Sequence, residues 1–231
     1  MRDDGLPFQD RVAAGRALGV RLAAMGLADP VVLALPRGGV PVGLEVARAL
    51  NAPLDLLLVR KIGVPWQPEL AVGAVMDGDE PVVVVEPHVQ AEARIDGEYI
   101  ERRAWEELKE IERRRALYLA QRAPEPVAGH TAIVVDDGIA TGTTMRAALR
   151  GLRRRRPTRL VLAVPVAPPE TIDALRAEVD DVVCLAQPER FGAIGYFYRD
   201  FHQLTDDEVI ALMRQAPASR AAPPRSARWS A

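Results

Sequence analysis

The sequence lacks the features that mark disulfide-stabilised, membrane-spanning and nucleic-acid-binding proteins. A single cysteine, Cys184, excludes a disulfide within the chain and fits a reducing compartment. No apolar run approaches the ~20 residues that span a bilayer, and the N-terminus has no basic-then-apolar signal pattern. The formal net charge of −2 carries no basic excess. We therefore expect a soluble, cytoplasmic protein without nucleic-acid or membrane partners.

Sites built on histidine or cysteine are not indicated either. The histidines, His88, His130 and His202, are scattered without the spacing of metal ligands. Cys184 lies in the apolar run 182–185, where a thiol is expected to be buried and unreactive. The chemistry of this protein is therefore expected to come from other residue types.

The chain does contain apolar runs that alternate with amphipathic stretches. Its 231 residues, 48% of them hydrophobic, suffice for an α/β domain with a substantial core. This alternation predicts a doubly wound parallel sheet. The expected strands are residues 31–35, 54–59, 131–135, 160–164 and 182–185, and the expected helices are residues 8–27, 41–50, 99–122, 144–154, 169–179 and 206–213.

Residues 62–96 interrupt the alternation, because glycine and proline punctuate them. We interpret this region as an excursion from the main sheet, with a hairpin and a mobile loop. The run Arg113-Arg114-Arg115 is interpreted as a solvated helix face. We expect a domain at 1–215, with its core at about 30–186 and a small hood at about 187–204, and a disordered tail at 216–231.

The most informative segment runs from Ile133 to Met145. An apolar strand leads into two adjacent acids, then into a loop of small and hydroxyl residues, then into a helix that begins near Thr144. A helix start offers free N–H groups and a positive dipole end, and glycine lets the backbone approach a ligand closely. The phosphate-binding residues are predicted to be Gly138, Ala140, Thr141, Gly142, Thr143 and Thr144.

The two acids, Asp136 and Asp137, would repel a phosphate and so are expected to serve another part of the ligand. Ionised carboxylates only accept hydrogen bonds, which suits vicinal hydroxyls and a nearby Mg²⁺ ion. A ribose 5-phosphate satisfies both halves of the loop.

This segment resembles the phosphoribosyl-diphosphate motif of type I phosphoribosyltransferases: an apolar strand, two acids, three variable residues, Thr-Gly and a further Thr. The resemblance implies the fold over residues 30–204 and an Mg²⁺-dependent transfer of the phosphoribosyl group to a nitrogen base, as in nucleobase salvage. It also implies a homodimer, catalytic roles for Asp136, Asp137 and Lys61, and indirect contact of the two acids with the metal.

The resemblance further implies a loop that binds the diphosphate after the first strand. Arg37, Gly38 and Gly39 stand at that place, where two glycines would permit an unusual backbone. Arg60 and Lys61, which would end the second strand, are further candidate diphosphate ligands.

The acceptor base is left open by two signals that disagree. Ala140 stands where the hypoxanthine-guanine type has an aspartate, as in the adenine and orotate types. The hood segment Pro188-Glu189-Arg190-Phe191 is instead similar to the hypoxanthine-guanine type, in which the phenylalanine stacks on the base. Phe191 is therefore a candidate base-binding residue, with plain hood packing as its alternative. A regulator that senses the sugar diphosphate, and a phosphorylase or hydrolase on the same fold, are alternative functions.

Overall fold

The computed structural model describes residues 6–77, 81–120 and 122–217. The predicted disordered tail, 216–231, lies outside the described residues except for its first two positions, so it stays a prediction.

The main sheet has five parallel strands in the order β2-β1-β6-β7-β8. All residues of β1 and β6 are buried, which explains why these strands appear in the sequence as continuous apolar runs. The predicted doubly wound parallel sheet is confirmed. The strands are β1 (Pro30–Ala34), β2 (Leu54–Leu56), β6 (Thr131–Val135), β7 (Arg159–Val166) and β8 (Asp181–Ala186).

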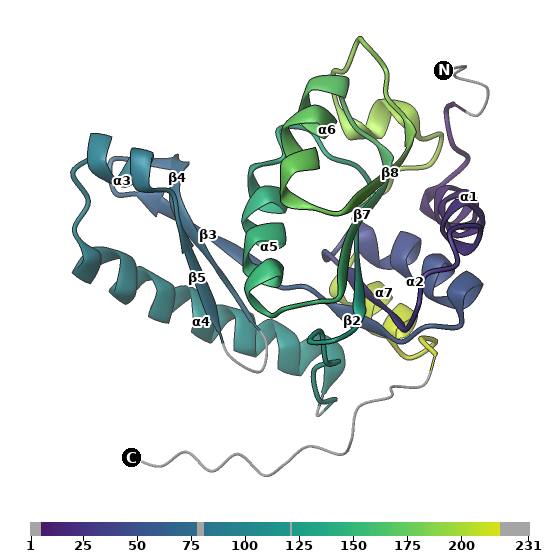
Figure 1. The fold of residues 1–231 in the computed structure, drawn as a ribbon, viewed down its shortest axis with the longest axis horizontal. Helices are drawn as coiled ribbons and strands as arrows, with labels where there is room; N and C mark the ends of the chain where they lie inside the picture. The colour runs from purple at the N-terminus through teal and green to yellow at the C-terminus, as the bar shows by residue number, and fades with distance from the viewer. Residues whose placement is uncertain (1–5, 78–80, 121, 218–231) are drawn as a thin grey trace.

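Helices cover both faces of this sheet (Figure 1). Alternate residues of β1 point to opposite faces: Val32 and Ala34 belong to one core, and Val31 and Leu33 to the other. The first core is completed by α1 (Arg11–Ala23), α2 (Gly39–Leu50) and α7 (Asp206–Met213), the second by α5 (Thr143–Arg154) and α6 (Pro169–Leu175).

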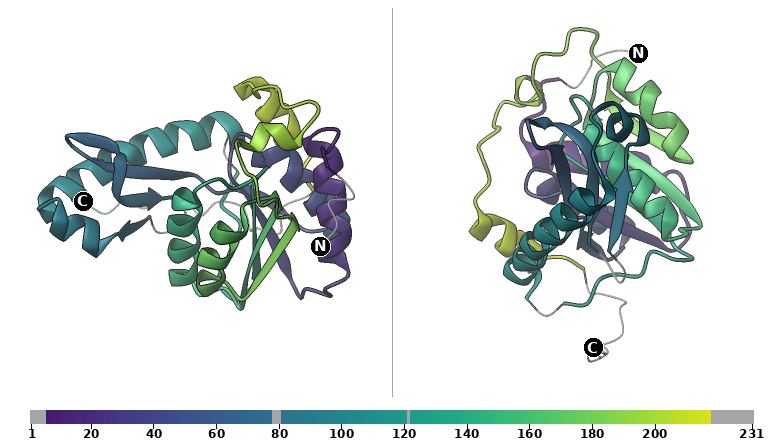
Figure 2. Two further views of the ribbon diagram at one scale, coloured as in Figure 1. Left: turned by 90° about the horizontal axis from the view of Figure 1, so that it is seen from above. Right: turned by 90° about the vertical axis from the view of Figure 1, so that its left-hand side faces the viewer.

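The excursion after β2 is an arm that projects from the main body (Figures 1 and 2). It consists of an antiparallel sheet and two helices, so the predicted hairpin is confirmed within a larger unit, while the mobility of the region stays a prediction. Its elements are β3 (Val59–Val64), β4 (Gln67–Met76), β5 (Val82–Val85), α3 (Pro87–Glu92) and α4 (Gly97–Leu119).

The predicted single strand at 54–59 is wrong, because the chain changes sheets inside it. Leu57 still donates its N–H to the carbonyl of Ala34 in the main sheet, at 2.9 Å. Leu58 instead pairs with Asp77: its N–H donates to Oδ1 of Asp77, and its carbonyl accepts from the N–H of Asp77, both at 3.2 Å. This pairing with the end of β4 moves the next residues into the arm.

A buried ion cluster joins the arm to the main body. Arg115 of α4 donates to Asp77 at 2.7 Å and to Asp55 of β2 at 3.0 Å. The predicted solvated face is therefore wrong for Arg115, although Arg113 and Arg114 do pair with Glu110 within the helix. Burial raises the pKa of Asp77, and the Arg115 charge opposes that rise. Paired buried charges of this kind fix one arrangement of the elements that carry them.

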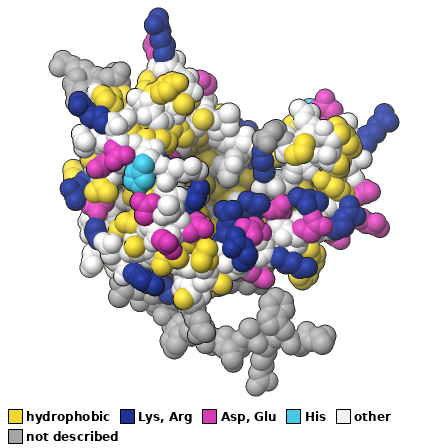
Figure 3. All heavy atoms as spheres, turned by 180° about the vertical axis from the view of Figure 1, so that it is seen from behind, with side chains coloured by type: hydrophobic (Ala, Val, Ile, Leu, Met, Phe, Trp, Pro, Cys, Tyr) yellow, Lys and Arg dark blue, Asp and Glu magenta, His cyan; other side chains and the backbone are white. Residues whose placement is uncertain are grey.

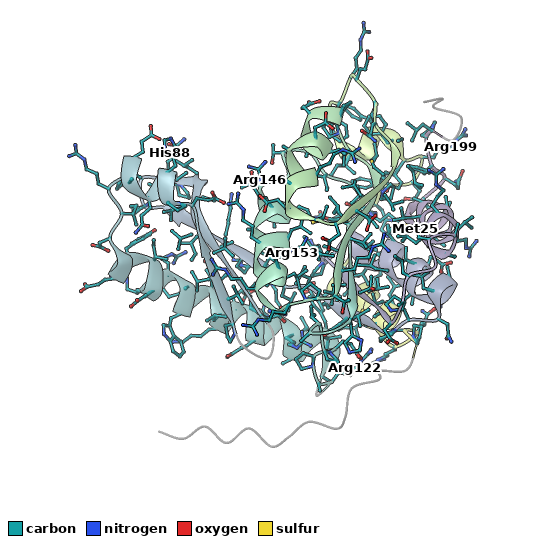
Figure 4. All side chains as sticks on the ribbon, in the orientation of Figure 1. Met25, His88, Arg122, Arg146, Arg153 and Arg199 are labelled. Atoms are coloured by element: carbon teal, nitrogen blue, oxygen red, sulfur yellow. The ribbon has the colours of Figure 1, made fainter. Side chains whose placement is uncertain are left out.

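Helix α5 of the main body also contacts the arm. Arg150 donates to Glu86 at the start of α3, at 2.6 Å, and Arg154 donates to the carbonyl of Val83 at 2.8 Å. Figure 4 labels Arg146 and Arg153 on the same helix, where Arg153 donates to Asp180 of the main body at 2.9 Å. The helix that begins at the predicted phosphate loop is thus fixed from both sides.

Cys184 is buried in β8, where its thiol donates to the carbonyl of Ala186 at 3.1 Å. Burial raises the pKa of the thiol to about 11, so almost no thiolate exists at neutral pH. We expect a chromogenic disulfide reagent to modify the native protein very slowly and the urea-unfolded protein at once. Rapid, stoichiometric modification of the native protein would contradict this burial.

No helix among the described residues is both long and apolar enough to cross a membrane. On the face shown in Figure 3, acidic and basic side chains are interspersed, most densely where the main body meets the arm.

Candidate functional site

Two loops meet at the point where the strand order of the main sheet reverses. The chain runs outward from β1 to β2 on one side and from β6 to β8 on the other. In such sheets the crevice outside the carboxyl ends of the two central strands is the usual ligand site. Here the first residue after β1, Leu35, donates its N–H to the carbonyl of Val135, the last residue of β6, at 2.9 Å. This bond brings the loops that follow the two strands side by side.

Glycine at 38 and 39 allows these loops to touch. A Cβ on Gly38 would lie 2.1 Å from Oδ2 of Asp137, and one on Gly39 would lie 2.8 Å from the carbonyl oxygen of Val135. The loop does have an unusual backbone, because the peptide bond between Pro36 and Arg37 is cis. Gly38 itself takes no part in it, since its φ of −60° is ordinary. Close approach, rather than conformational freedom, explains these glycines.

The start of α5 faces outward beside this contact. Gly142 is the N-cap residue with a φ of +75°, which favours glycine, and no side chain caps the helix. The loop is anchored from behind, because Ile139 donates its N–H to Val166 at 3.0 Å and Thr171 donates to the carbonyl of Ala140 at 2.7 Å. The exposed residues of this loop are Ala140, Thr141, Thr143 and Thr144.

The two acids have different surroundings. Asp137 is buried, and its Oδ2 accepts a hydrogen bond from Nε of Arg11 at 2.8 Å. Asp136 is half-buried, and its Oδ1 accepts from the N–H of Asp137 at 2.8 Å. The structure thus brings the predicted pair to the crevice but turns one carboxylate towards an arginine of α1.

Ionising Asp136 is costly in the free protein. Burial raises its pKa well above the usual range, and the adjacent Asp137 carboxylate raises it further. Burial also raises the pKa of Asp137, while the Arg11 hydrogen bond and charge oppose that rise. Hydroxyl donors or a cation at Asp136 would offset its cost of ionisation.

Arg11 is a residue that sequence reasoning missed. It lies on the same helical face as Ala14, Leu18 and Leu22, all of which are buried. An arginine within a buried helical stripe needs a charged or polar partner. That spacing was the available signal, but the partner stands 126 residues further along the chain.

The predicted diphosphate ligands lie on two elements. Arg37 follows β1 and approaches Asp206 at 3.7 Å. Arg60 and Lys61 lie inside β3 of the arm, so the prediction that they end a strand of the main sheet is wrong. Nε of Arg60 donates to Glu107 of α4 at 2.8 Å.

A cavity nonetheless connects Arg60 and Lys61 with the predicted phosphate loop. It has a volume of about 560 Å³ and is lined by Arg60 and Lys61 from β3 and by Thr144 from α5. A smaller neighbouring cavity is lined by Pro36, Arg60 and Thr144, which links it to the loop after β1. The arm therefore supplies one wall of the crevice and α5 supplies another.

The hood lies against the acid loop. A Cβ on Gly138 would lie 2.7 Å from Cγ2 of Ile194, and Tyr198 donates its hydroxyl to the carbonyl of Asp137. Phe191 is half-buried, with its ring centroid 5.1 Å from that of Phe197. Hood packing therefore occupies at least part of the Phe191 ring, and stacking on a base stays a prediction.

Comparison with known proteins gives a consistent result. The sequence model described as the phosphoribosyl transferase domain matches residues 12–201. A Mycobacterium tuberculosis protein, recorded in two strains and provisionally named a phosphoribosyl transferase, is 45% identical over 209 residues, which are 90% of this chain. The chain spans about half of that relative, 47% of its length. A crystal structure of the protein TT1426 from Thermus thermophilus is 42% identical, with a TM-score of 0.82, and the match covers 92% of this chain and 100% of that one.

Proposed function

Because the chain belongs to the phosphoribosyl transferase domain family, we propose that it transfers the 5-phosphoribosyl group of phosphoribosyl diphosphate to a nitrogen acceptor and releases pyrophosphate. The observation that carries the proposal is the contact between the two loops at the reversal of strand order. It places a half-buried carboxylate, Asp136, beside the outward-facing start of α5.

Each part of the sugar diphosphate has a matching group in this proposal. The N–H groups and hydroxyls of Thr141, Thr143 and Thr144 would bind the 5-phosphate, and the helix dipole of α5 would add to their attraction. Asp136 would accept hydrogen bonds from the ribose hydroxyls. Arg37, after β1, and Lys61, in β3, would bind the diphosphate.

Mg²⁺ fits the donor groups of this site if the protein and the bound diphosphate both supply its ligands. Among the described residues, no three His, Cys, Asp or Glu side chains are grouped to hold a metal. Mg²⁺ commonly takes one or two carboxylates, keeps several waters and binds substrate phosphates. Asp136 would therefore hold it with the diphosphate, and the bound ion would neutralise charge on the leaving group.

The chain's own residues would bind and orient the substrate for displacement at the anomeric carbon. The transition state of such a transfer carries oxocarbenium character, so electrostatic stabilisation of the departing diphosphate lowers the barrier. Ala140 supplies no acid or base to an acceptor, which disfavours a 6-oxopurine, while the segment 188–191 favours one. These two signals oppose each other, so the class of acceptor has to be identified by experiment.

The test is a panel of nucleobases and related nitrogen compounds, incubated with the protein, phosphoribosyl diphosphate and Mg²⁺. We expect pyrophosphate release that depends on one acceptor class, with the phosphoribosylated product identified by mass spectrometry. Binding of the sugar diphosphate without consumption of any acceptor would favour a sensing regulator. Cleavage by phosphate or water alone would favour a phosphorylase or hydrolase. A homodimer and a cytoplasmic location are further predictions.

A further inference from the structure

Three hydrogen bonds hold Asp137 in place. Its carboxylate accepts from Nε of Arg11 at 2.8 Å, its N–H donates to Oδ1 of Asp136 at 2.8 Å, and its carbonyl accepts from the hydroxyl of Tyr198. Only 10% of its side chain is exposed, and the position a Cβ of Gly38 would take is 2.1 Å from Oδ2. The Asp137 carboxylate therefore lies under the loop after β1, directed towards α1.

Arg11 is held independently of Asp137. Its Nη1 donates to the carbonyl of His202 at 2.9 Å, and its guanidinium lies over the ring of Phe201, 3.8 Å from the centroid. Stacking on Phe201 and the hydrogen bond to His202 together fix the orientation of the guanidinium, so that its Nε points at the acid loop. Arg11 is also the first residue of α1, where the helix dipole disfavours a cation, so its burial there depends on these contacts.

We propose that Arg11 is a positioning residue that holds the Asp137 carboxylate away from the ligand, so that Asp136 alone presents a carboxylate to the ribose hydroxyls. This inference rests on the proposed function. It assigns different tasks to two acids that are adjacent in the sequence: Asp136 contacts the sugar, and Asp137 shapes the loop that carries Asp136.

Charge supports this division of tasks. Two adjacent carboxylates directed into one crevice would repel each other and the diphosphate. The Arg11 guanidinium compensates one of them below the crevice, while the Tyr198 hydroxyl holds the Asp137 backbone through its carbonyl. The N–H of Asp137 then restrains Oδ1 of Asp136, so the orientation of the ligand-facing acid depends on the buried pair.

The geometry offers a matched substitution. Nε2 of glutamine stands at the same number of bonds from Cα as Nε of arginine, and asparagine keeps the acceptor oxygen of aspartate. We would measure the affinity for phosphoribosyl diphosphate with Mg²⁺ by calorimetry, and the melting temperature without ligand, for Arg11→Gln, Asp137→Asn and the double variant.

Each single variant should weaken the affinity by about 10-fold or more, because each leaves a buried charge without its partner. The double variant should recover most of that loss and should melt above both single variants, since a neutral Gln–Asn hydrogen bond replaces the ion pair. Asp136→Asn, in contrast, should lose at least about 100-fold in affinity while remaining folded.

A double variant that regains its melting temperature but binds as poorly as Asp136→Asn would overturn the inference, because Asp137 itself would then contact the sugar. If the double variant does not fold, Arg11→Lys decides. Lysine keeps the charge that compensates Asp137, so this variant should retain more affinity than Arg11→Gln; an affinity as low as that of Arg11→Gln would overturn the inference. Wild-type protein with no affinity for the sugar diphosphate would overturn the proposed function, and the inference with it.

Discussion

Asp136→Asn is expected to lower the affinity for phosphoribosyl diphosphate by at least about 100-fold, since two charge-assisted hydrogen bonds to the ribose hydroxyls would be lost. The same change should raise the melting temperature of the free protein at neutral pH. The reason is that burial and the neighbouring Asp137 raise the pKa of Asp136, so ionising this carboxylate destabilises the folded state. Loss of binding together with a gain in stability is the signature of a ligand-binding group rather than a structural one.

The direction of the Asp136 pKa shift determines how this gain in stability depends on pH. The folded protein keeps the Asp136 proton at pH values where the unfolded chain has released it. The free energy of unfolding therefore falls as pH rises from the pKa of Asp136 in the unfolded chain to its pKa in the folded protein. Asparagine carries no charge at any pH, so Asp136→Asn avoids this loss of stability. The difference in melting temperature between Asp136→Asn and wild type should grow across that range and then level off.

Asp173→Asn is the matched control, because Asp173 lies on α6 with 74% of its side chain exposed. It should leave both the ligand-dependent melting shift and the stability of the free protein unchanged. An unaltered ligand-dependent shift in Asp136→Asn would remove this residue from the site.

Gly38→Ala is expected to cost about 3 kcal/mol of stability and most of the ligand affinity. The added methyl group would lie 2.1 Å from Oδ2 and 2.5 Å from Cγ of Asp137, so the carboxylate must move away from Arg11. Urea denaturation gives the stability, and calorimetry with the sugar diphosphate gives the affinity.

Gly97→Ala provides the control for this prediction. Gly97 begins α4, and nothing lies within 4 Å of the Cβ that alanine would add. Alanine has the higher helix propensity, so this variant should be as stable as the wild type or slightly more stable. Equal behaviour of the two alanine variants would show that the loops are not in contact.

The sequence predicts the main sheet and the course of the chain from β6 into α5 well, because both depend on local signals. The buried strands β1 and β6 are continuous apolar runs, and the acid loop is defined by the order of residues between 133 and 145. The end of the second strand could not be predicted, because Asp77 determines it from 19 residues away. The roles of Arg11 and Arg115 could not be predicted for the same reason, since each is buried with partners that are distant in the chain.

The hydrogen bond from Tyr198 to the carbonyl of Asp137 has a consequence for how two substrates would bind. Burial raises the pKa of this phenol, so it remains a donor at every physiological pH and ties the hood to the acid loop. A compound that shifts the hood would also shift this loop, and would change the free energy of binding of the sugar diphosphate that we propose as substrate. Thermodynamic linkage would make the effect mutual, so the sugar diphosphate would alter the affinity for that compound by an equal factor.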